Sequence, residues 1–160
     1  MEVEVVSEGP VHCFAALGNV LLSVYWGAPD AAVLHDRIAW VERVRASHGK
    51  GGLLVVVCDG ASGSLPDAAF RERSRAQAQR FEDTIVFSAS VIEGDGVLPG
   101  LVRAFLRGLA LLAPRRVETA FFERVEPAAA WVEARAVPHG GPDATQLRNA
   151  LETLRARRLP

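Results

Sequence analysis

The 160-residue chain is poor in cysteine, with only Cys13 and Cys58. A domain of this length buries a core without disulfides, and Cys58 ends an apolar run, so we expect both thiols to be reduced and buried. The formal net charge of −1 gives no overall attraction to nucleic acid, and no nucleic-acid partner is expected. The apolar runs are too short to cross a bilayer and the first residues are acidic, where a signal peptide would be basic. We therefore expect a cytoplasmic protein without membrane insertion.

The common catalytic and cofactor-binding motifs are also missing. The sequence contains no HExxH, CxxC, GxxxxGK[ST], GxGxxG or GxSxG. The segment 60–64 falls one residue short of a nucleophile elbow, because position 64 is not glycine. The four histidines are scattered without metal-ligand spacing, at His12, His35, His48 and His139. The sequence therefore predicts no metal and no cofactor, and a hydrolase using Ser62 would have no base that can be named.

What the chain does contain is the composition of one ordinary globular domain, 49% hydrophobic and 23% charged. Its most distinctive stretch is the apolar run from Leu53 to Cys58, which lies between glycines and Asp59-Gly60. A run without alternating polar residues is typical of a strand covered on both faces, as in a parallel sheet between helices. The polar turn that follows lies where open α/β sheets commonly bind ligands.

The order of the predicted elements gives the fold class. A period-two pattern predicts a strand over 3–6. Two apolar, β-branched or aromatic runs predict further strands over 11–17 and 20–26, joined by a tight Gly18-Asn19 hairpin. Helices and strands then alternate to the end of the chain. We predict an α/β fold with a mixed sheet that opens with an antiparallel hairpin and continues as β-α-β-α-β-α-β-α, plus a C-terminal amphipathic helix. The predicted domain covers 1–136, a linker 137–143, and the final helix 144–160.

Three of the predicted helices differ in how their apolar and charged residues are arranged. In the helix expected from Pro29 to His48, the apolar positions are Leu34, Ile38, Val41 and Val44, while Arg37 falls among the polar residues. The helix from Pro66 to Phe81 has a thin apolar side and a basic remainder. In the helix from Leu98 to Leu112, leucines including Leu101 are expected to pack on the sheet, and Gly108 to allow close approach to a strand.

This element order resembles that of STAS domains, closest to the divergent SpoIIAA-like branch that is often grouped with lipid-binding CRAL-TRIO domains. The likeness covers about 11–135 and includes the opening hairpin, the strand 53–57 entering a polar turn, and the closing short helix 126–132. In phosphoregulated members of this bacterial family, a serine at the start of the second helix is phosphorylated by a partner kinase. The matching segment here, 59–64, has an acid, glycines and serines but lacks the adjacent Asp-Ser pair.

The candidate site follows from that turn and the helix after it. Backbone amides at a helix start attract anions, and serine hydroxyls add donors. The candidate partner- or anion-binding residues are Asp59, Ser62, Ser64, Arg71 and Arg75. The alternative interpretations are a capping serine and a solvated basic helix face.

Two functions remain open from the sequence. The first is a non-enzymatic regulatory or scaffolding module that works by protein association through this turn and basic helix, with a kinase or regulator as partner. The second is a small-ligand or lipid carrier whose apolar cavity is lined by aromatic residues such as Tyr25, Trp26 and Trp40. A homodimer is expected in addition, through the C-terminal helix and the exposed first strand.

Overall fold

The computed structural model describes residues 1–60, 66–111 and 116–158. It confirms the predicted α/β class: one mixed sheet has the strand order β1-β2-β3-β4-β5-β6. The first three strands are antiparallel, and β3 to β6 run parallel to one another. The strands are β1 (Glu4–Gly9), β2 (His12–Leu17), β3 (Val20–Tyr25), β4 (Gly51–Val57), β5 (Ile85–Ile92) and β6 (Glu118–Phe122).

The predicted hairpin joins β2 and β3. Leu17 pairs with Val20, and Gly18 between them has a φ of 57°, a left-handed conformation that glycine adopts without strain. The buried Asn19 amide donates hydrogen bonds from Nδ2 to the carbonyls of Lys50 and Ala136. One turn residue thus fixes the hairpin to the start of β4 and the end of a helix on the opposite layer.

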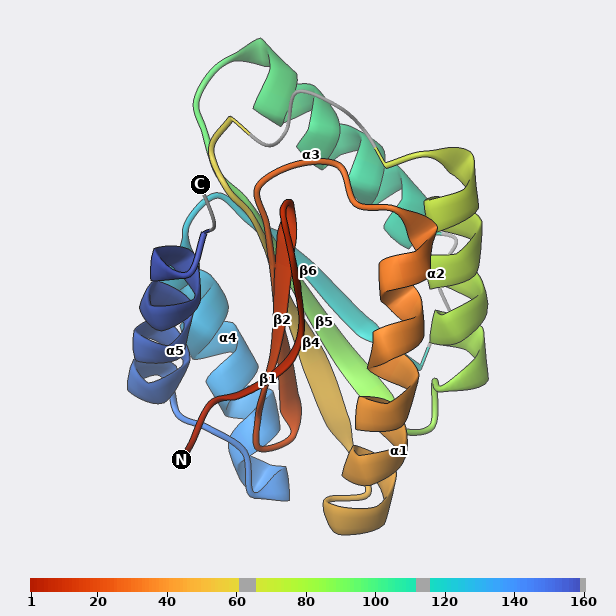
Figure 1. Cartoon of the computed structure of the whole chain (residues 1–160), viewed down its shortest axis with the longest axis vertical. Helices are drawn as coiled ribbons and strands as arrows, with labels where there is room; N and C mark the ends of the chain where they lie inside the picture. The colour runs from red at the N-terminus through yellow and green to blue at the C-terminus, as the bar shows by residue number, and fades with distance from the viewer. Residues whose placement is uncertain (61–65, 112–115, 159–160) are drawn as a thin grey trace.

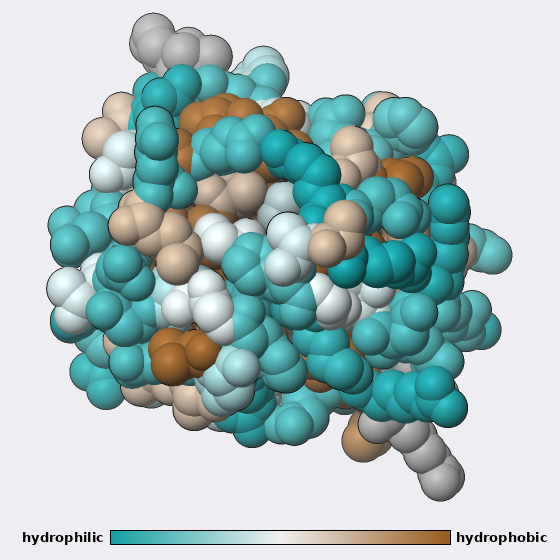
Figure 2. Space-filling view, turned by 90° about the horizontal axis from the view of Figure 1, so that it is seen from below, coloured by the Kyte–Doolittle hydropathy of each residue, from teal (hydrophilic) through white to brown (hydrophobic). Residues whose placement is uncertain are grey.

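Helices cover both faces of the sheet (Figure 1). On one face lie η1 (Ala31–His35), α1 (Asp36–Ser47) and α2 (Ala68–Arg80), and on the other α4 (Val125–Ala136) and α5 (Ala144–Ala156). The short η3 (Val137–His139) joins α4 to the turn before α5, and α3 (Val97–Ala110) packs beside β5 and β6. The end of the molecule at which β4 begins is largely hydrophilic, with separate apolar patches (Figure 2).

The face under α4 and α5 is tightly closed. Leu147, Leu151 and Leu154 of α5 are at most 1% exposed and belong to one cluster with Leu54 and Val56 of β4. Asp143 starts α5 with a capping box that involves the Gln146 side chain. The apolar side of the C-terminal helix is therefore used inside its own chain and supplies no support for a dimer.

The opposite face is less complete. On β4, Leu53, Val55 and Val57 are only half-buried, and α2 has no buried residue at all. Both faces of this strand had been expected to be covered. The difference arises because α2 brings few large apolar side chains to the sheet: Phe70 packs partly against this cluster, and Phe81 is buried just after the helix ends.

The helix expected from Pro29 also differs. Asp30 caps a 3-10 helix by accepting a hydrogen bond from the Ala32 amide, and the α-helix proper begins only at Asp36. Within α1, Arg37 is buried together with Trp40, Val41 and Val44, although the sequence pattern had placed it among the polar residues. The apolar side of this helix therefore includes a position that the pattern had assigned to its polar side.

Candidate functional site

The turn after β4 is only partly described. Asp59 is exposed, and a β-carbon added at Gly94, in the loop after β5, would stand 2.7 Å from its Oδ1 atom. Ser62 and Ser64 lie outside the described residues. The structure thus places Asp59 beside the next loop along the sheet edge, and the roles of the two serines stay a prediction.

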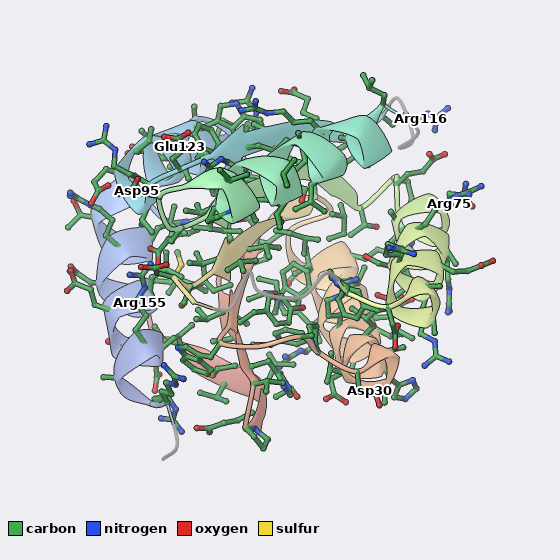
Figure 3. The ribbon with its side chains drawn as sticks, turned by 90° about the horizontal axis from the view of Figure 1, so that it is seen from above. Asp30, Arg75, Asp95, Arg116, Glu123 and Arg155 are labelled. Atoms are coloured by element: carbon green, nitrogen blue, oxygen red, sulfur yellow. The ribbon has the colours of Figure 1, made fainter. Side chains whose placement is uncertain are left out.

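The two candidate arginines lie on α2. Arg71 is half-buried and Arg75 is exposed. Seen from above, Arg75 lies on the opposite side of the molecule from Arg155 of α5, which forms an ion pair with Glu93 (Figure 3). Whether Arg71 and Arg75 form a contact surface also stays a prediction.

A cavity of about 190 Å³ lies between α1, α2 and the sheet. The cavity exists because α2 leaves this face of β4 and β5 incompletely covered. Its lining includes Arg37 and Val41 of α1, Gln77 and Ser74 of α2, Leu53 of β4 and Ser88 of β5. The walls are mostly apolar, and Arg37 is the one charged residue that lines them in the part of the chain that the structure describes. Such a mixture is typical of small-molecule sites.

This cavity differs from the one expected. The sequence hypothesis drew its lining from Tyr25, Trp26 and Trp40, but Tyr25 and Trp40 are buried in the cluster under α1, and Trp26 packs on the other face of the sheet. These aromatic side chains belong to the packed core.

An apolar stripe on α3 is the second notable feature. We define the α3 stripe as Val97, Leu101, Ala104, Gly108 and Leu111, which follow one another at intervals of four, three, four and three residues. All five are exposed, and Val97, Leu101 and Leu111 reach 80%, 60% and 88%. Single exposed leucines are ordinary, but a row of them along one helix is typical of an interaction surface.

The α3 stripe corrects two predictions. Leu101 had been expected to pack on the sheet, and it is largely exposed. Gly108 had been expected to approach a strand closely, yet a β-carbon added there would meet no described atom within 4 Å. The helix spans one side of the molecule from near Asp95 to near Arg116 (Figure 3). Val102 on its other side is buried.

Ser7, His12 and Asp36 have the composition of a catalytic triad, but the hydrogen bonds between them do not follow the order that a triad needs. Ser7 Oγ donates to Asp36 Oδ2 at 2.6 Å and lies 3.1 Å from His12 Nε2. Because the hydroxyl proton goes to the carboxylate, His12 Nε2 donates to Ser7. A nucleophilic serine needs the reverse, with histidine taking its proton and the acid on the other ring nitrogen. His12 Nδ1 is buried and has no partner among the described residues, so the cluster ties β1 and β2 to α1.

A second hollow, at the end where the parallel strands begin, has a volume of about 540 Å³. Its lining mixes basic groups, among them Lys50 and Arg116, with acidic groups such as Glu82 and Asp83. Arg135 is already engaged there, bonded to Glu118 at 2.6 Å and lying over the Trp131 ring. With charges of both signs, this hollow favours no particular class of ligand.

Over residues 1–60, 66–111 and 116–158, no group of three His, Cys, Asp or Glu side chains could hold a metal ion. Within the same ranges, every helix is too short or too polar to cross a bilayer.

Sequence reasoning missed both Arg37 as a cavity residue and the α3 stripe. The signal for Arg37 was its spacing, since Leu34, Arg37, Val41 and Val44 are three, four and three residues apart and share one helix side. The signal for α3 was its near lack of charge, with only Arg103 and Arg107 between Val97 and Leu111. Comparisons with protein-family models, with curated proteins and with solved structures give no match, so the likeness to STAS domains stays a prediction.

Proposed function

We propose that this protein is a non-enzymatic module that acts by protein association, and that its partner across the α3 stripe is a second copy of the chain. The observation that carries the proposal is the exposure of Val97, Leu101 and Leu111 along one side of α3. Leaving such a row in water forgoes burial worth roughly 25 cal/mol per Å² of apolar surface. A partner that covers it recovers that free energy.

The stripe is self-complementary, which favours a second copy. Two antiparallel α3 helices related by an axis between positions 104 and 105 would place each Leu101 opposite Gly108 of the other copy. None of the described atoms would crowd a β-carbon at Gly108, so the large side chain of one helix can fill the gap left by the small residue of the other. Such a two-fold contact closes on itself and stops at a dimer.

The contact is expected to be modest in strength. Each copy contributes three large exposed apolar side chains, so the interface falls at the low end of specific contacts, below about 1,200 Å². We expect a dissociation constant on the order of micromolar rather than nanomolar. A reversible contact of this strength suits a regulatory module.

Sedimentation equilibrium across the micromolar range tests the proposal. Wild type should pass from monomer to dimer as concentration rises, and Leu101→Asp should stay monomeric because it would bury an unpaired charge. Asn149→Asp adds the same charge at an exposed position of α5 and is the matched control. A wild type that is monomeric throughout, or a Leu101→Asp variant that dimerises equally well, would overturn self-association through α3.

A further inference from the structure

Arg37 carries a buried positive charge that lacks a negative partner. Its side chain is 8% exposed, and none of the described carboxylates lies within ion-pair distance of it. Its only acceptor there is a neutral amide oxygen, Gln77 Oε1, which receives hydrogen bonds from Nε at 3.2 Å and from Nη2 at 3.0 Å. Buried charges in proteins are normally paired, because removing an unpaired ion from water is costly.

The neighbouring groups do not compensate this charge. Tyr25 is close enough to interact with Arg37, but burial raises the pKa of its phenol to about 12, so it is neutral near pH 7. The Asp36 carboxylate accepts from Ser7, and the Asp30 carboxylate caps η1. Arg37 Nη1 donates no hydrogen bond to any residue that the structure describes.

The cavity beside Arg37 offers the other parts of a ligand site. The hydroxyls of Ser74 and Ser88 line it from α2 and β5, and neither bonds to another described residue. The remaining walls include Val41, Leu53 and Phe81, which suit an apolar body. At about 190 Å³ the cavity is smaller than the roughly 300 Å³ at which drug-sized pockets begin. A small amphipathic anion fits these conditions.

We propose that this cavity binds a small monocarboxylate with an apolar body, whose carboxylate pairs with the Arg37 guanidinium. A planar guanidinium matches a carboxylate with two parallel hydrogen bonds. One cation balances one negative charge, whereas a phosphate ester would carry nearly two and would require further cations that the described lining does not supply. The hydroxyls of Ser74 and Ser88 are available to the second lone pairs of the carboxylate.

Gln77 acts as the positioning residue of this site. Its Oε1 holds two of the Arg37 nitrogens, while its Nε2 donates to the Leu34 carbonyl at 2.7 Å. The amide is therefore fixed from both ends, and it holds the guanidinium against the cavity without neutralising it.

Titration calorimetry and thermal unfolding with hexanoate test the proposal, with hexanol as the neutral analogue and inorganic phosphate as the alternative anion. Hexanoate should bind wild type and raise its unfolding midpoint, and hexanol should bind at least tenfold more weakly. Arg37→Met keeps the length of the side chain without its charge and should weaken hexanoate at least tenfold. Arg43→Met, on the exposed side of α1, should bind hexanoate like wild type.

A second readout separates binding from a structural role. If Arg37 serves a ligand, the ligand-free Arg37→Met protein should unfold at the same temperature as wild type or higher, because an uncompensated buried charge has been removed. Should that variant fail to fold, Ser88→Leu fills the cavity while Arg37 remains, and it should also lose hexanoate binding.

The proposal is overturned if hexanoate does not bind wild type, if hexanol or phosphate binds as tightly, or if the folded Arg37→Met or Ser88→Leu protein binds hexanoate unchanged. It stands apart from self-association. Leu101→Asp should retain hexanoate binding, and Arg37→Met should retain the dimer, so either proposal can fail alone.

Discussion

The imidazole of His12 lies between β1 and the start of α1, 6% exposed and bonded to Ser7. Burial lowers the pKa of this ring, and the Asp36 carboxylate acts in the opposite direction with a smaller effect. In the unfolded chain a histidine takes up its proton near pH 6.5, whereas the folded protein keeps His12 neutral to a lower pH. The unfolded state therefore binds more protons as the pH falls below about 6.5, and the free energy of unfolding decreases.

Replacing His12 by a side chain that does not titrate tests this effect. His12→Gln keeps a hydrogen-bond donor for Ser7 but does not titrate, so its free energy of unfolding should fall less than that of wild type between about pH 7 and pH 5. The contribution of one histidine is at most about 1.4 kcal/mol per pH unit. Urea unfolding at several pH values measures it, with the exposed His35→Gln as control. Equal slopes for wild type and His12→Gln would contradict the assignment.

Arg37 shows why a residue can be misplaced from sequence alone. The positions 34, 38, 41 and 44 form a good apolar stripe, and an arginine next to it is normally solvated. In the structure the buried side includes positions 34, 37, 41 and 44, which follow the same helical period. Periodicity cannot choose between two adjacent stripes when each contains apolar residues. The choice depends on the Gln77 amide, which is 40 positions away in the sequence.

At the scale of elements, the boundaries of most helices and strands were predictable because turn residues mark them. Asp67 caps α2 and Asp143 caps α5, each by accepting from a backbone amide. What was not predictable was which side of α3 meets the sheet. Leu101 belongs to the apolar side that the sequence predicted for this helix, yet it lies on the exposed side. The direction in which such a helix packs depends on the elements around it as well as on its own pattern.

The same substitution on two helices measures this difference. Leu151→Ala on α5 removes a fully packed side chain and should lower the free energy of unfolding by about 2 to 5 kcal/mol. Leu101→Ala on α3 should change it by less than about 0.5 kcal/mol, because that side chain is 60% exposed. Urea unfolding at a protein concentration below dimerisation provides both values. A cost for Leu101→Ala near that for Leu151→Ala would mean that α3 is turned inward.

At the scale of the whole molecule, the sheet has two unequal faces. The side under α4 and α5 is closed by leucines and alanines, and it supplies most of the buried core. The side under α1 and α2 leaves β4 half-covered and holds the cavity with Arg37. The order of the predicted elements indicated the sheet but not the difference in burial between its two faces. That difference depends on how many large apolar side chains each helix packs against the sheet. The candidate turn was predicted from its position after the central strand. Its serines, Ser62 and Ser64, lie outside the described residues.

Two surfaces now compete as the site of association, and ionic strength distinguishes them. A contact through the α3 stripe is apolar, so dimerisation should be unchanged or stronger as NaCl rises from about 0.05 M to about 0.5 M. A contact through the basic side of α2, with Arg71 and Arg75, should weaken over the same range, since the Debye length shortens to a few ångströms. The net charge of −1 adds no strong overall repulsion to either case.

The dissociation constant of the dimer, measured by sedimentation equilibrium at both salt concentrations, distinguishes the two surfaces. Arg75→Glu and Leu101→Asp are the paired variants. We expect salt-insensitive dimers that Leu101→Asp abolishes and Arg75→Glu leaves intact. Dimers that weaken in salt and disappear in Arg75→Glu would move the dimer contact to α2, the helix at which the sequence predicted association with a partner protein. Because each variant changes one exposed residue on a different helix, a change confined to one of them identifies the surface without a structure of the dimer.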